Sequence, residues 1–149
     1  MNPANRIPYL SDVGLLIGRV ALGVVFVAHG WQKFNDMGHD GVTKMFEGMD
    51  VPAASLSAYY STWVELIGGI ALLAGVVTPI VGVLLALDMA GAFWFVHKSN
   101  GVFVTENGYE LVLALGGAAL LLALAGAGRF SVDGVLLARP KPREPEHAA

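Results

Sequence analysis

Four long apolar runs, separated by shorter polar stretches, form the dominant pattern of this chain. They cover residues 13–31, 59–77, 79–97 and 108–126. Each is close to the roughly 20 residues that an α-helix needs to cross about 30 Å of hydrocarbon. The pattern predicts an all-α integral membrane protein, and an antiparallel four-helix bundle is the simplest arrangement of four such helices.

The apolar runs divide the chain into three parts. Residues 1–12 form an N-terminal segment, residues 13–128 form the four-helix domain, and residues 129–149 form a tail whose prolines and charges predict disorder. The longest connection, residues 32–58, is expected to be a loop on the outer side of the membrane, with room for a short interfacial helix around residues 42–49.

Capping residues indicate where two of the helices begin. Ser11 and Asp12 are expected to cap the first helix. Thr78 is expected to cap the third helix, with Pro79 at its first position, where a missing N–H costs nothing. The second and third helices are therefore expected to form a hairpin with almost no loop.

Lysine and arginine residues near the helix ends indicate the orientation. The side of the membrane with more of them is expected to be cytoplasmic. One side carries Arg6, Arg129, Arg139, Lys141 and Arg143, and the other carries Lys33, Lys44 and Lys98. Both termini are therefore predicted to be cytoplasmic.

Composition agrees with a membrane location and narrows the chemistry. Hydrophobic residues make up 55% of the 149 residues, and the mean hydropathy is +0.61. The net charge of −3, without a basic patch, gives no reason to expect a nucleic-acid partner. Because the chain has no cysteine, it has no disulfide, no thiolate nucleophile and no cysteine-held zinc or iron–sulfur site.

Three ionisable residues lie deep in the apolar runs. Asp88 would cost about 3 kcal/mol near the bilayer midplane if it faced lipid. Long side chains can bridge the differences in depth, so Arg19, Glu65 and Asp88 are expected to form one buried polar core. Because one guanidinium faces two carboxylates, one carboxyl is expected to keep its proton. A purely structural salt-bridge cluster that fixes helix register is the alternative.

A second group of ionisable residues is expected near the outer surface. It consists of His29, Lys33, His97 and Glu110. Imidazoles beside a carboxylate suit proton exchange or hydrogen bonding to a quinone carbonyl. Ordinary capping or snorkelling at the interface is the simpler alternative, and a haem held by two histidines is the least favoured one. The sequence indicates no metal site and no covalently bound cofactor.

Small residues mark positions where helices can approach closely. They are Gly14 with Gly18, Gly68 with Gly69, Gly82 with Ala86 and Ala90, and Gly116 with Gly117. Any such face that points outward would suit a homo-oligomer.

The order of several short motifs resembles that of the DoxX family of small bacterial membrane proteins. The motifs are Gly18-Arg19, Phe26-Val-Ala-His29-Gly30-Trp-Gln-Lys33-Phe34, Gly48-Met-Asp-Val51-Pro52-Ala, Val64-Glu65-Leu-Ile-Gly68-Gly69, Ala86-Leu-Asp88-Met, His97, Asn107-Gly108-Tyr109-Glu110-Leu and Gly128-Arg129-Phe130-Ser131-Val-Asp133. The resemblance implies a four-helix bundle in the bacterial cytoplasmic (inner) membrane. It also implies that the two polar groups described above are the family-like polar set.

The resemblance further implies a place in quinol oxidase, thiosulfate:quinone oxidoreductase or related membrane redox systems. We therefore expect a small integral subunit of a quinone-linked redox complex, either accessory or in contact with the quinone, with other membrane or peripheral subunits as partners. An assembly or scaffolding protein without chemistry and a small proton-coupled carrier are the alternatives. The chain shows no nucleophile with a base and no dinucleotide motif, so it is not expected to be an enzyme on its own, and no catalytic residue is assigned.

Overall fold

The computed structural model describes residues 9–136, and every regular element in that range is helical. The α-helices are α1 (Leu10–Trp31), α2 (Gly38–Glu47), α3 (Ala54–Ala74), α4 (Thr78–Ala92), α5 (Glu110–Ala125) and α6 (Val132–Leu136). Two π-helical segments, Gln32–Met37 and Phe93–His97, continue α1 and α4, and a 3₁₀ turn at Val104–Glu106 precedes α5.

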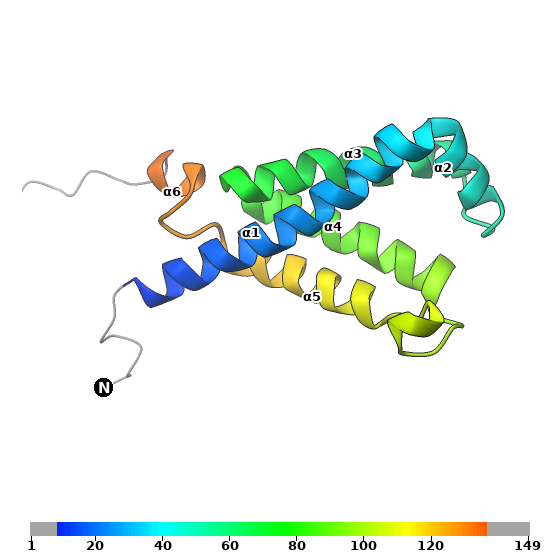
Figure 1. Ribbon diagram of the computed structural model, residues 1–149. Helices are drawn as coiled ribbons and strands as arrows, with labels where there is room; N and C mark the ends of the chain where they lie inside the picture. The colour runs from blue at the N-terminus through cyan, green and yellow to red at the C-terminus, as the bar shows by residue number, and fades with distance from the viewer. Residues whose placement is uncertain (1–8, 137–149) are drawn as a thin grey trace, which may run out of the picture.

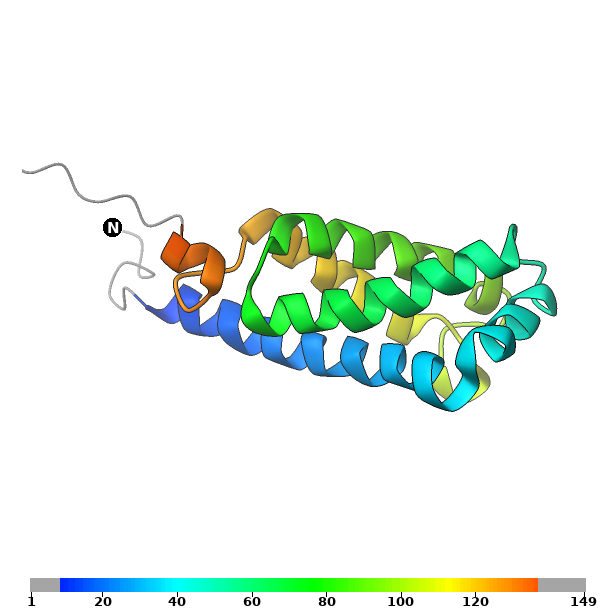
Figure 2. The same ribbon diagram turned by 90° about the horizontal axis from the view of Figure 1, so that it is seen from above.

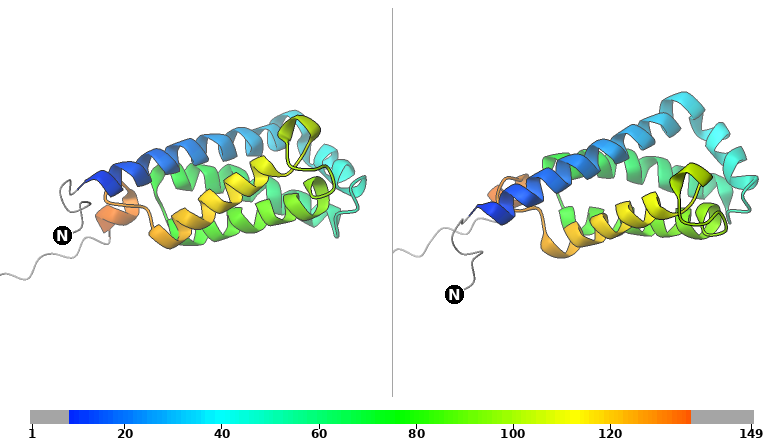
Figure 3. Two further views of the ribbon diagram at one scale, coloured as in Figure 1. Left: turned by 90° about the horizontal axis from the view of Figure 1, so that it is seen from below. Right: turned by 60° about the horizontal axis from the view of Figure 1, so that its bottom comes forward.

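The helices α1, α3, α4 and α5 lie side by side, and each runs antiparallel to the next (Figure 1). Helix α1 packs mainly on α3, and α4 mainly on α5. Seen from above, α3 and α4 form a hairpin with a tight turn (Figure 2). Seen from below, α5 lies in front, along α4 (Figure 3). Buried apolar side chains of all four helices form one core, which includes Leu22, Phe26, Leu72, Leu85, Met89 and Leu122.

The two ends of the molecule differ. The start of α1, the α3–α4 turn and α6 lie together at one end, which we call the α6 end (Figure 1). Helix α2 and the connection between α4 and α5 lie at the opposite end, which we call the α2 end.

The apolar outer surface identifies a membrane protein. Large hydrophobic side chains such as Ile17, Ile67, Leu87, Leu113 and Leu124 are exposed along the sides of the helices. In the described residues, three helical stretches are long and apolar enough to cross a membrane: Leu10–Glu47, Ala54–Ala74 and Thr78–His97. Helix α5 is apolar but shorter, with 16 residues.

The observed helix boundaries differ from those expected from hydropathy. The first helix begins at Leu10, the second covers Ala54–Ala74 instead of residues 59–77, and the fourth is confined to Glu110–Ala125. The greatest difference is at residues 32–58, where a loop with a short helix around residues 42–49 was expected; α2 confirms that helix but begins earlier, at Gly38. The π-helical segment and α2 make most of this stretch helical, because its polar and apolar residues alternate with a helical period that mean hydropathy does not detect.

Residues far away in the sequence supply the polar contacts at two helix starts. Asp12 does not cap α1; its carboxylate accepts a hydrogen bond from the backbone N–H of Arg129. At the start of α4, the Asp133 carboxylate accepts hydrogen bonds from Val77 N (2.8 Å) and Thr78 N (3.0 Å). Thr78 was the expected cap, but its own hydroxyl oxygen is buried and finds no hydrogen-bond partner among residues 9–136.

Close helix approaches occur at glycines that only partly match the expected pairs. A Cβ on Gly30 would lie 2.4 Å from the backbone N of Leu66, and one on Gly69 would lie 2.7 Å from the backbone N of Val27. Gly82 likewise lies against the backbone of α5 at Ala119. Gly14, by contrast, has no neighbour within 4 Å of such an atom. The contact between α1 and α3 therefore depends on Gly30, which the spacing of small residues did not reveal.

Residues 1–8 and 137–149 lie outside the described residues. The expected N-terminal segment falls mostly in the first of these ranges, and the expected disordered tail falls mostly in the second. The two ranges also contain the charged residues Arg6, Arg139, Lys141 and Arg143. Between α5 and residue 136, the chain forms a short turn and α6.

Candidate functional site

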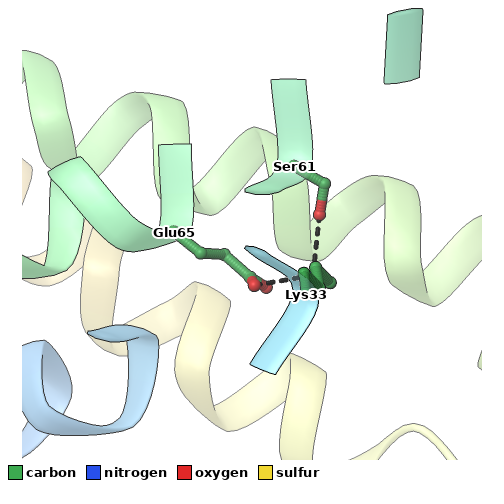
Figure 4. A network of polar contacts seen from close by, with 3 residues as sticks. All are labelled: Lys33, Ser61 and Glu65. Atoms are coloured by element: carbon green, nitrogen blue, oxygen red, sulfur yellow. Dashed lines mark hydrogen bonds and ion pairs between the residues drawn. The ribbon is translucent and has the colours of Figure 1, made fainter. Parts of the chain in front are cut away.

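An ion pair between α3 and the π-helical segment that follows α1 lies at the centre of the candidate site (Figure 4). Lys33 Nζ donates to Glu65 Oε2 at 2.6 Å and to Ser61 Oγ at 2.8 Å. Ser61 and Glu65 are four residues apart on α3, so they share a helix face and both reach Lys33. Lys33 was expected nearer the surface and Ser61 was not expected in the site, although this i, i+4 spacing was the available signal.

Lys33 belongs to the π-helical segment Gln32–Met37, which follows α1 without a break. A π-helical turn holds an extra residue and is frequently found at functional sites. The segment connects α1 to α2, and α2 packs against α3. The Lys33 contacts therefore tie the α1–α2 junction to the middle of α3.

The second carboxyl of the site is Asp88 on α4. Its exposed fraction is 9%, and it lies next to the carboxyl of Glu65. Lys33 lies within ion-pair distance of Glu65, and no ion pair is found for Asp88 within residues 9–136. Two buried carboxyl groups thus lie together, and the ammonium beside them pairs with Glu65.

These residues line a cavity of about 510 Å³ toward the α2 end. Its polar lining includes His29, Lys33, Ser61, Glu65, Asp88 and His97. Aromatic and methionine side chains supply much of the rest, including Phe26, Phe46, Phe95, Met45, Met49 and Met89. Ligand sites in proteins are usually of this size and have this mixture of apolar walls and a few polar groups.

The expected outer group is divided by the structure. His29, Lys33 and His97 line the cavity. Glu110 does not line it; its carboxylate accepts a hydrogen bond from Val104 N at 2.7 Å and orders the connection before α5. His97 Nδ1 lies 2.7 Å from the backbone oxygen of Asn107. Because a carbonyl oxygen can only accept, Nδ1 donates in neutral His97, and Nε2 remains an acceptor.

The expected core of Arg19, Glu65 and Asp88 is also divided. All three residues are buried, but Arg19 is directed toward the α6 end, away from the carboxyl groups. Its guanidinium donates to the backbone oxygens of Leu72 (2.9 Å), Leu73 (3.3 Å) and Phe130. The last carbonyls of a helix have no partner within the helix, and they attract a long cationic side chain. Lys33 therefore takes the place beside Glu65 that was expected for Arg19.

The position of Arg19 also explains why residue 75 is a glycine. Gly75 ends α3 with a φ of +69°, and a Cβ there would lie 2.4 Å from Arg19 Nη1. Both the left-handed backbone and the lack of space require glycine at this position. Within residues 9–136, no group of three or more histidine, aspartate or glutamate side chains is arranged to hold a metal ion.

Comparison with known proteins identifies the family. The DoxX family profile matches residues 14–98, which is more than half of the chain. The chain belongs to the DoxX family. The match includes the DoxX residues that line the cavity from α1, α3 and α4, whereas Glu110 and Asp133 lie beyond it.

Several curated relatives align with most of this DoxX chain. "Putative oxidoreductase CatD" of Bacillus subtilis (strain 168) is 35% identical over 82% of this chain and 86% of the relative. "Inner membrane protein YqjF" of Escherichia coli (strain K12) is 32% identical over 85% and 95%. "Uncharacterized membrane protein Rv3486" of Mycobacterium tuberculosis (strain ATCC 25618 / H37Rv) is 31% identical over 77% and 76%. No solved structure matches the chain.

Proposed function

We propose that this DoxX protein is a small integral subunit of a membrane redox assembly and that its cavity receives the headgroup of a quinone. The observation that carries the proposal is the cavity of about 510 Å³, in which hydrogen-bonding side chains meet apolar and aromatic walls. The name of the relative CatD, which contains the word oxidoreductase, supports the same class of process.

The polar groups of the cavity match both forms of such a headgroup. A quinone carbonyl accepts hydrogen bonds, and His29 and Lys33 can donate them. A hydroxyl of the reduced form donates, and the free Nε2 of His97 can accept. The apolar ring and tail would lie against side chains such as Phe26 and Phe95.

The proposed placement has α1, α3, α4 and α5 crossing the bacterial inner membrane as an antiparallel four-helix bundle with both termini cytoplasmic. The start of α1 and α6 lie at the same end of the molecule, which supports termini on one side (Figure 1). The name of the relative YqjF supports the inner membrane. In this placement the cavity lies toward the outer side.

Two measurements on the native protein in a mild detergent test the proposal. Affinity purification with mass spectrometry is expected to recover other redox subunits in stoichiometric amount. A short-chain benzoquinone analogue is expected to bind the purified protein, and His29→Ala is expected to weaken binding at least fivefold. Glu110→Gln is the matched control, because Glu110 does not line the cavity. Recovery of the protein alone, together with no binding of the analogue, would refute the proposal.

A further inference from the structure

Asp88 is the one carboxyl of the cavity for which the described residues provide no cation. The charged side chains that line the cavity are Lys33, Glu65 and Asp88. Lys33 lies 2.6 Å from Glu65 and also donates to Ser61, so its ammonium is already engaged. The remaining charge of the cluster is that of Asp88.

No element around Asp88 supplies a second cation to the cavity. Helix α1 contributes the imidazole of His29, and the π-helical segment after α4 contributes that of His97. Helix α3 contributes the phenol of Tyr60 together with Glu65, and the α5 residues in the lining, such as Val112, are apolar. Two buried carboxylates beside one ammonium leave one negative charge uncompensated, which costs several kcal/mol.

We propose that the cavity binds a lipophilic organic monocation, an ammonium ion that carries aromatic or alkyl groups, and that this cation replaces one proton held by the Glu65–Asp88 carboxyl pair. The proposal goes beyond the redox function and does not rest on it. The proposed ligand carries a positive charge, whereas a quinone is neutral. It is recognised by Asp88, the cavity carboxyl that lies outside the Lys33–Glu65 ion pair.

The walls of the cavity suit an organic cation. Phe26, Tyr60 and Phe95 offer aromatic rings, which attract cations over their faces. Met45 and Met49 offer flexible side chains that adapt to ligands of different shape. A bare metal ion fits less well, because it needs several oxygen or nitrogen ligands, and residues 9–136 hold no group of three acidic or histidine side chains that would provide them.

The exchange is balanced in charge and atoms. The carboxyl pair of Glu65 and Asp88 releases one proton to solvent, and the negative charge that this leaves pairs with the incoming monocation. The net charge of the cavity and its ligand is then the same before and after binding. Lys33 keeps its contact with Glu65 throughout.

Calorimetric titration of the purified protein with benzyltriethylammonium tests this proposal. We expect binding with release of about one proton, so the affinity should rise up to about tenfold per pH unit while the carboxyl pair holds a proton in the free protein. Infrared spectra should show loss of one protonated carboxyl band when the cation binds. Benzenesulfonate, an aromatic anion, is expected not to bind.

Variants test whether cation binding and proton release depend on Asp88. Asp88→Asn is expected to weaken binding of the cation at least tenfold and to abolish proton release, whereas Glu110→Gln is expected to change neither. The thermal midpoint, followed by tryptophan fluorescence, shows whether Asp88→Asn is folded; if it is not, Asp88→Glu is expected to retain proton-coupled binding in its place. The proposal is overturned if benzyltriethylammonium does not bind, if it binds without proton release, or if benzenesulfonate binds equally well. The benzoquinone titration is separate, so either proposal can fail alone.

Discussion

Removal of the Lys33 ammonium gives the sharpest test of the site. The Lys33 and Glu65 side chains are only 16% and 4% exposed, so Lys33→Met leaves the Glu65 carboxyl buried without a cation. In the folded variant, Glu65 avoids this charge by taking a proton. The free-energy cost of that proton is about 1.4 kcal/mol for each unit by which the solution pH exceeds the ordinary glutamate pKa of about 4.3.

The expected loss of stability therefore depends on pH. It is about 4 kcal/mol at pH 7 and about 1 kcal/mol at pH 5. The sign follows from proton uptake on folding: a variant that binds a proton when it folds becomes less stable as the pH rises. Unfolding of the detergent-solubilised protein can be followed by the fluorescence of its three tryptophans.

A double-mutant cycle provides the control for this prediction. Glu65→Gln in the Lys33→Met background removes the group that needs the proton, so the double variant is expected to recover most of the loss at pH 7 and to lose its pH dependence. The reasoning is refuted if Lys33→Met is as stable as the wild type at pH 7, or if its loss is equal at pH 5 and pH 7.

Three further predictions concern the α6 end and the helix contacts. Asp133→Ala is expected to destabilise the protein by about 1–2 kcal/mol in thermal unfolding, and Asp133→Asn by less, because the amide oxygen can still accept one of the two hydrogen bonds. Gly30→Ala is expected to cost about 1–3 kcal/mol, whereas Gly14→Ala, with no neighbour, should cost nothing measurable; equal effects would contradict the assigned contact. Arg19→Met removes the donor to the backbone oxygens of Leu72, Leu73 and Phe130 and is expected to cost about 3 kcal/mol or more by the same assay, with Arg19→Lys in between.

The sequence predicted the helical, membrane-embedded character of the chain because apolar runs long enough to cross a bilayer are typical of membrane-spanning helices. It also predicted that Glu65 and Asp88 would be buried, since charged groups in such runs avoid lipid. DoxX membership is confirmed by the family match. Whether the buried charges act in chemistry remains a prediction.

The partners of those charges could not be predicted. Helical spacing gives depth along one helix, but the rotation of each helix about its axis depends on contacts such as Gly30 against Leu66. The π-helical segment also changes the side chains that face inward after Trp31, and no sequence rule predicts it. Lys33 was therefore expected at the surface, and Arg19 was expected beside Glu65.

The α6 end has a consequence for synthesis of the protein in the cell. Arg19 binds the backbone of Phe130, 111 residues later, and the turn between α3 and α4 is completed by Asp133. A chain emerging from the ribosome can insert its first three long helices but cannot close this end until residue 133 has been made. Until then, the buried guanidinium and the exposed amides at the start of α4 remain incompletely paired. Nascent chains that stop before Asp133 should be recognised by membrane quality-control proteases. Chains that extend a few residues beyond Asp133 should be protected from these proteases.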